Sequence, residues 1–206
     1  MPSLRLRLAS TWLPEWSLKG HLEMVSALTT GALETLLAER AAKAAPRLHP
    51  PMRPLVGNLS ECRAAMAWNH NALVESLVEE IGEKQAFDLG RQSLFKVGLT
   101  IGEEFRRTLG VGDDIDDLIM AARALYKVLG ISFAVEHQGD GLEMVVQRCA
   151  LSHYYSEKAC MLLSAVDEGV IRGLNPRVGM RFDRMITSGF PTCIARIWIE
   201  AGGAAK

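Results

Sequence analysis

Three cysteines, a histidine and an aspartate in the last third of the chain have the chemistry of a reactive centre. The stretch RCALSHYYSEKAC contains Cys149, His153 and Cys160, and it is followed by Asp167 and Cys193. A cysteine thiolate attacks an electrophilic carbon when a nearby base accepts its proton. Alternatively, Cys149, Cys160 and Cys193 could bind a zinc ion that activates water. These residue types permit either scheme, and the sequence does not choose between them.

Helical spacing places several of these side chains on one polar stripe. From His153, polar residues recur at intervals of four, three, four and three as far as Asp167, and the other side of the helix is apolar. Cysteine is unusual on a solvated face, because free thiols tend to be buried. We expect Cys149, Cys193 and Asp167 around one site, with Cys160 and His153 at its edge. The alternative is an ordinary surface helix, with the cysteines as separate core residues.

The composition describes a globular chain without a strong charge. The chain has 206 residues, of which 49% are apolar, with a net charge of −1 and a pI near 6.5. The chain has no excess of basic residues, which binding to nucleic acid or to an anionic membrane would need. Arginines interrupt the apolar runs at the N-terminus, and no apolar run approaches the ~20 residues needed to span a bilayer. We expect a cytoplasmic protein that binds neither nucleic acid nor membranes.

The cysteine spacing excludes two common cysteine-based motifs. The four cysteines form no CxxC pair, so a zinc ribbon or a thioredoxin-like site is not indicated. In a reducing cytosol, we expect them to be thiols or metal ligands rather than disulfides.

Helical periodicity dominates the chain as far as Gly130. After an irregular start, in which LRLRL is a possible short strand, we expect helices at 21–45, 60–82, 84–109 and 113–130. A Pro-rich break at 46–58 separates the first helix from the others. The chain is thus predicted to have an N-terminal segment, residues 1–50, and an α+β domain, residues 58–206, in one compact domain overall.

The hydrophobic period changes after Gly130. Alternating segments rich in β-branched residues predict four strands, at 131–138, 142–149, 178–186 and 193–200. A segment with helical spacing, 152–172, lies between the first two strands and the last two. A D-G turn at 139–141 favours a hairpin. The predicted fold class is α+β, with N-terminal helices followed by a β-β-α-β-β unit whose two hairpins form one antiparallel sheet.

Three smaller features have ordinary structural explanations. The acidic residues of GDDIDDLIMAA differ in spacing from a magnesium-binding DDxxD motif, and helix capping accounts for them. His70, which lies between two asparagines, is expected to be solvated or to cap a helix. Gly98 and Gly102 share one helix face and would allow another backbone to pack closely, so we expect a homo-oligomer.

The segment from Cys149 to Cys193 has an ordered set of short motifs: a cysteine at a strand end, a helix that reaches Asp167, GLNP at 173–176, RFDR at 181–184, and SGFPTCIARI. In the order and spacing of these motifs it resembles the C-terminal half of the L-2-amino-thiazoline-4-carboxylic acid hydrolase family. The helices before this segment are similar to the helical N-terminal half of that family in architecture.

The resemblance implies a hydrolase that opens a C–N bond in a small, cyclic, amidine-like substrate that carries a carboxylate. Asp167 would pair with the amidinium group, and Cys149, Cys193 and His153 would complete the catalytic set. Arg184 would bind the substrate carboxylate in a bidentate manner, and Asn175, in the GLNP break, would be a second substrate contact.

A second function from another class fits the same residues. The chain could be a non-catalytic sensor module that binds a small molecule or a metal. An enzyme should present its thiol and carboxylate in an open cleft, whereas a sensor should enclose an apolar pocket with the cysteines closed round a metal.

Overall fold

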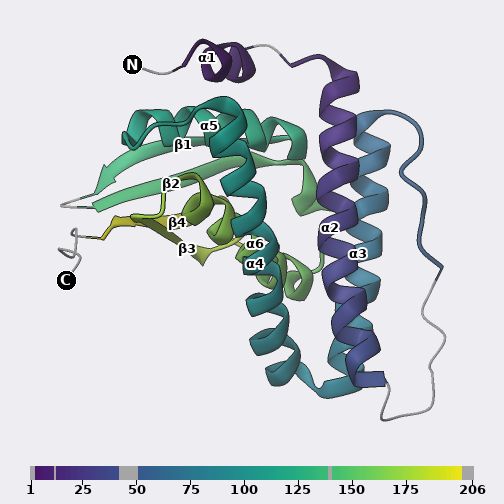
Figure 1. Cartoon of the computed structure of the whole chain (residues 1–206). Helices are drawn as coiled ribbons and strands as arrows, with labels where there is room; N and C mark the ends of the chain where they lie inside the picture. The colour runs from purple at the N-terminus through teal and green to yellow at the C-terminus, as the bar shows by residue number, and fades with distance from the viewer. Residues whose placement is uncertain (1–2, 12, 42–50, 139–140, 201–206) are drawn as a thin grey trace.

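The computed structural model describes residues 3–11, 13–41, 51–138 and 141–200 (Figure 1). Helices form the first part of the chain and a four-stranded sheet forms the last part, as predicted for an α+β fold. The elements are α1 (Leu4–Thr11), α2 (Glu15–Ala41), α3 (Leu59–Ile81), α4 (Glu83–Leu109), α5 (Ile115–Leu129), β1 (Ile131–Gln138), β2 (Gly141–Cys149), the 3-10 turn η1 (Ala150–His153), α6 (Glu157–Leu174), β3 (Val178–Arg184), the 3-10 turn η2 (Ile186–Ser188) and β4 (Cys193–Ile199).

The four strands form one antiparallel sheet in the order β1-β2-β4-β3. Each predicted hairpin is present, and the two hairpins join through β2 and β4. In that pairing Val146 lies opposite Cys193, while Cys149 lies opposite Ile131 on β1. Two strand-end cysteines, 149 and 193, are therefore brought to the same end of two neighbouring strands.

The expected LRLRL strand and the start of the helix expected at 152–172 differ in the structure. The LRLRL segment is not a strand but part of α1, because Leu6 is fully buried while its N–H donates to the hydroxyl of Ser3, 3.1 Å away, at the start of the helix. The helix predicted at 152–172 begins only at Glu157. Ser156 caps it by accepting a hydrogen bond from the N–H of Ala159 at 3.2 Å.

The helix expected at 21–45 begins earlier, at Glu15, within the stretch that was expected to be irregular. The boundaries of α3, α4 and α5 agree with the prediction to within a few residues. Asn58 caps α3, and it forms a reciprocal capping box with Glu61. The acidic cluster lies at the start of α5, as expected, where Asp117 accepts a hydrogen bond from the N–H of Gly112. The Pro-rich break at 46–58 and the turn at 139–141 lie partly outside the described residues, and the division of the chain at 50/58 stays a prediction.

Helices α4 and α6 pack backbone against backbone. Gly98 and Gly102 on α4 face α6, and Gly169 and Gly173 on α6 face α4. A Cβ atom added at Gly98 would lie 2.0 Å from a carbonyl oxygen of α6, and one added at Gly169 would lie 2.2 Å from a carbonyl oxygen of α4. Gly98 and Gly102, which suggested close contact between two copies of the chain, instead contact α6 of the same chain. The homo-oligomer stays a prediction, without that support.

The core consists of three hydrophobic clusters, and two of them include residues of α6. One lies between the sheet and helices α1, α5 and α6, a second joins α2, α3, α4 and α6, and a third, smaller one includes Met66 and Leu151. Figure 1 shows the α2–α3 pair on one side of the molecule and the sheet on the other, with α4 and α6 between them. In the described part of the chain, no helix is long and apolar enough to cross a bilayer.

Candidate functional site

A cavity of about 90 Å³ lies where the three clusters meet. Its wall is mostly apolar, with residues such as Val146, Leu163 and Phe182. Helices α2, α3, α5 and α6 and all four strands contribute to it. An engineered apolar cavity of about 150 Å³ holds benzene, so this smaller volume corresponds to part of a small ring compound.

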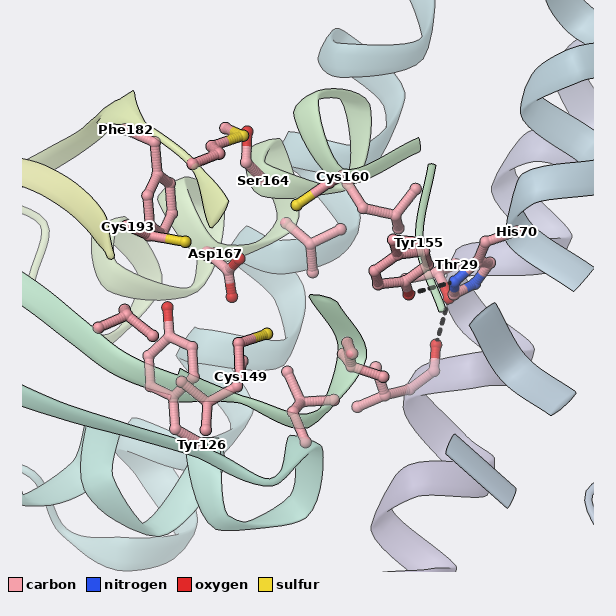
Figure 2. Close-up of a pocket in the computed structure, with 18 of the residues that line it drawn as sticks. Thr29, His70, Tyr126, Cys149, Tyr155, Cys160, Ser164, Asp167, Phe182 and Cys193 are labelled. Carbon is pink, nitrogen blue, oxygen red and sulfur yellow. Dashed lines mark hydrogen bonds between the residues drawn. The ribbon is translucent and has the colours of Figure 1, made fainter. Parts of the chain in front are cut away.

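Four of the candidate site residues line this cavity. Cys149 comes from the end of β2 and Cys193 from the start of β4, while Cys160 and Asp167 come from α6. Their side chains point into a common space, with the carboxyl group of Asp167 between the sulfur atoms of Cys149 and Cys193 (Figure 2). The structure therefore brings together the thiols and the carboxylate, and their catalytic roles stay predictions.

Asp167 is the acidic group of this cavity. Burial raises the pKa of its carboxyl group to about 7, although the neighbouring Tyr126 hydroxyl acts in the opposite direction. That hydroxyl points towards Asp167 (Figure 2). It is buried and close enough to Asp167 to lower the pKa of that carboxyl group, but it does not reach hydrogen-bond geometry with any described residue. At neutral pH, Asp167 is thus close to equal populations of its acid and base forms, which suits a general acid–base.

The three thiols of the cavity differ in their surroundings. Burial raises the pKa of all three, and it raises that of Cys160 to about 12. Backbone N–H groups partly offset this effect for Cys149, from residues 151 and 152, and for Cys193, whose sulfur accepts a hydrogen bond from Ile186 at 3.3 Å. Cys149 and Cys193 are therefore better thiolate candidates than Cys160.

A buried hydrogen-bonded chain forms another part of the wall. The hydroxyl of Thr29 lies 2.8 Å from Nε2 of His70, and Nδ1 of His70 lies 2.7 Å from the hydroxyl of Tyr155. His70 is 1% exposed, and burial lowers its pKa to about 3, so it is neutral. The prediction of a solvated or capping His70 was wrong. Its spacing from Met66, Leu73 and other core positions of α3 was the available signal.

The two shifted groups should give opposite pH dependences of stability. Because the pKa of His70 falls on folding, its contribution to the free energy of unfolding is complete above pH 6.5 and is lost as the pH falls towards 3. Because the pKa of Asp167 rises on folding, its contribution is complete below pH 3.8 and is lost as the pH rises towards 7. In the wild-type protein the two effects offset each other over much of this range.

Single variants should therefore separate the two effects. We expect the stability of His70→Gln to fall as the pH rises from 4 to 7, and that of Asp167→Asn to rise, each relative to the double variant. Urea unfolding at several pH values measures both slopes. His137→Gln, at an exposed position on β1, is the control and should keep the wild-type profile. Parallel profiles for the two single variants would contradict the assignment.

Three predicted site residues lie elsewhere. His153 is exposed in η1 and does not line the cavity, because α6 starts after it and the helical spacing assumed for it does not apply. Asn175 is buried, but its side chain donates to the carbonyl of Asp113 and accepts from the N–H of Arg177. Arg184 is exposed, with its guanidinium 5.7 Å from the ring centre of Phe190. A catalytic role for His153 and substrate contacts from Asn175 and Arg184 do not fit this geometry.

The predicted zinc ligands Cys149, Cys160 and Cys193 share the cavity but do not form a ligand set. Among the described residues, no group of three or more His, Cys, Asp and Glu side chains is arranged to hold a metal ion. The geometry of this chain therefore gives no support to a metal centre built from these sulfurs.

The chain is similar to one protein family in sequence and to solved structures of other proteins in its fold. The family model described as L-2-amino-thiazoline-4-carboxylic acid hydrolase matches residues 60–197, and among curated proteins none matches. A trafficking protein particle complex subunit 3 from Naegleria fowleri, covalently bound to palmitic acid, is similar in structure. It has 18% identity and a TM-score of 0.53, over 68% of this chain and 95% of that chain. The phenol-responsive sensory domain of the transcription activator PoxR, with phenol, has 16% identity and a TM-score of 0.47, over 81% and 88%. The subunit 3 structure shows a shared fold.

Proposed function

Since this chain belongs to the L-2-amino-thiazoline-4-carboxylic acid hydrolase family, we propose that it hydrolyses a C–N bond of a small cyclic amidine inside the cavity beside α6. The observation that carries the proposal is the meeting of Asp167, whose pKa is about 7, with Cys149 and Cys193 on one cavity wall. A carboxylate that changes its protonation near neutral pH can move a proton in both directions during one reaction cycle.

The cavity residues support a two-step reaction. In the first step, ionised Asp167 accepts the proton of the Cys149 thiol, and the sulfur forms a bond to the amidine carbon of the ring. The protonated Asp167 then donates this proton to the ring nitrogen, which leaves as the C–N bond breaks. In the second step, a water molecule gives a proton to Asp167 and attacks the same carbon. The C–S bond breaks, and the Cys149 sulfur takes the proton back.

Cys149 is the better candidate nucleophile for two reasons. The backbone N–H groups of Leu151 and Ser152 face its sulfur and lower the pKa of the thiol, against the effect of burial. Cys149 also keeps partial exposure, whereas Cys193 is only 7% exposed. In this scheme Cys193 forms part of the wall beside the reacting carbon.

Turnover of small cyclic amidines tests this function. The purified protein is incubated with 2-amino-thiazoline and related rings, and ring-opened products are identified by mass spectrometry. We expect Cys149→Ser to lower the rate by at least ~100-fold, because a hydroxyl replaces the attacking sulfur. Cys62→Ala is the matched control, since Cys62 is a fully buried thiol that does not line the cavity. The proposal fails if the wild-type protein releases no product, or if both variants react at the wild-type rate.

A binding module without catalysis is the second candidate function. The mostly apolar wall and the raised pKa values of all three cavity thiols favour it, because buried neutral thiols are weak nucleophiles. The same incubation separates the two functions. A compound that binds to wild-type and Cys149→Ser protein alike, and is recovered unchanged from both, would favour the binding module.

A further inference from the structure

The described wall of the cavity contains an acidic side chain but no cationic one. Among the described residues that line it, Asp167 has the one acidic side chain, and there is no lysine or arginine. His70, the one histidine of this set, is neutral and already bonded through both ring nitrogens to Thr29 and Tyr155. A negatively charged ligand group would therefore meet apolar atoms or a carboxylate, and no cation.

A second, smaller cavity next to the first also has no lysine or arginine among its described lining residues. It has a volume of about 50 Å³ and shares part of its wall with the first, including Tyr126 and Asp167. Its far end is formed by His21 and Phe105, whose rings lie 5.5 Å apart. Among its described lining residues there is again no lysine or arginine. Both spaces next to the carboxyl group of Asp167 thus lack a lysine or an arginine among their described lining residues.

The arginine that reaches the wall is occupied by other partners. Arg91 donates to the hydroxyl of Ser164 at 2.9 Å, but it also binds both carboxylate oxygens of Glu168 at 2.8 Å each. This ion pair, in which one guanidinium nitrogen contacts both carboxylate oxygens, offsets the charge of Arg91. Arg184, the residue expected to bind a substrate carboxylate, lies at the surface against Phe190.

We infer that the substrate of this site is a cyclic amidine that carries no carboxylate. The inference rests on the proposed function and narrows its substrate class. An amidinium group would pair with Asp167, and the buried hydroxyl of Tyr126, which has no hydrogen-bond partner among the described residues, would bond to a polar atom of the ring. A carboxylate on so small a ring would lie within a few ångströms of Asp167, where two like charges repel in a poorly solvated space.

Three ring compounds that differ in one substituent test the inference. They are 2-amino-thiazoline, its uncharged 4-carboxamide and its 4-carboxylate. Binding is measured by calorimetry on Cys149→Ser, which is expected to bind without turnover, and reaction is measured on the wild-type protein. We expect the carboxamide to bind on the order of 100-fold more tightly than the carboxylate. In Cys149→Ser/Asp167→Asn this difference should shrink to less than about tenfold, because the repelling carboxylate is gone.

The outcomes separate the inference from the proposed function. Tight binding and turnover of the carboxylate would overturn the inference and leave the hydrolase function in place. Binding and turnover that favour the two compounds without a carboxylate would support both. If none of the three compounds binds or reacts, the proposed function fails, and the inference fails with it.

Discussion

Asp167→Asn is expected to lose hydrolytic activity and to gain stability at neutral pH. An amide cannot accept the proton of a thiol, so the rate should fall by about 10²- to 10⁴-fold, the usual contribution of a general acid–base. The carboxyl group has its pKa raised to about 7 by burial, so its ionised form destabilises the folded protein. Removing it should raise the free energy of unfolding at pH 8 by on the order of 2 kcal/mol, after allowance for its partial exposure. The gain should vanish near pH 3.5.

Glu168→Gln is the matched control for this prediction. Glu168 is the next residue on α6, but it pairs with Arg91 and does not line the cavity. This variant should keep most of its turnover, with the pH profile moved to lower pH, because the negative charge of Glu168 contributes to the raised pKa of Asp167. It should also lose some stability, because it leaves Arg91 without its carboxylate partner. Loss of activity together with loss of stability in Asp167→Asn would mean that Asp167 holds the fold and has no catalytic role.

Gly98→Ala should strongly destabilise the protein, although the change adds only a methyl group. The new Cβ atom would lie 2.0 Å from the carbonyl oxygen of Val166, a backbone atom that cannot move without shifting α6. We expect a loss of about 3 kcal/mol or more in the free energy of unfolding, measured by urea denaturation. Turnover should also fall, because Val166 and Asp167 line the cavity and move with α6.

The same substitution at Gly20 should have the opposite effect on stability. Gly20 is exposed in α2, and a Cβ atom there would meet nothing within 4 Å. Alanine has a higher helix propensity than glycine, so Gly20→Ala should stabilise the protein by about 0.5–1 kcal/mol. If the two variants changed stability equally, the close packing of α4 on α6 would not be a determinant of the fold.

The hairpins and most helices were predictable because their signals are local. Helical spacing before Gly130 and alternation of β-branched residues after it are both properties of short windows. The convergence of Cys149 and Cys193 also followed from local signals, since both lie at strand ends of hairpins that share a sheet. Asp167 joined them because one helix lies between those hairpins along the chain.

The errors concern features that depend on long-range packing. His70 was expected in solvent because its asparagine neighbours are polar, but Thr29 and Tyr155, far away in the sequence, enclose it. The LRLRL segment alternates like a strand, yet it forms a helix, in which Leu6 packs in the core between the sheet and α5. The role expected of Arg184 came from a resemblance, and the course of β3 places that side chain at the surface.

The ionisation of Asp167 in the cavity is the central claim, and NMR of aspartate carboxyl carbons tests it directly. The protein is labelled with carbon-13 at aspartate carboxyl groups, and Asp167→Asn identifies the signal. We predict a titration with a pKa of about 7, which falls when 2-amino-thiazoline binds, because a cationic partner favours the ionised form. A titration near the ordinary aspartate value of 3.8, unchanged by the ligand, would contradict the account.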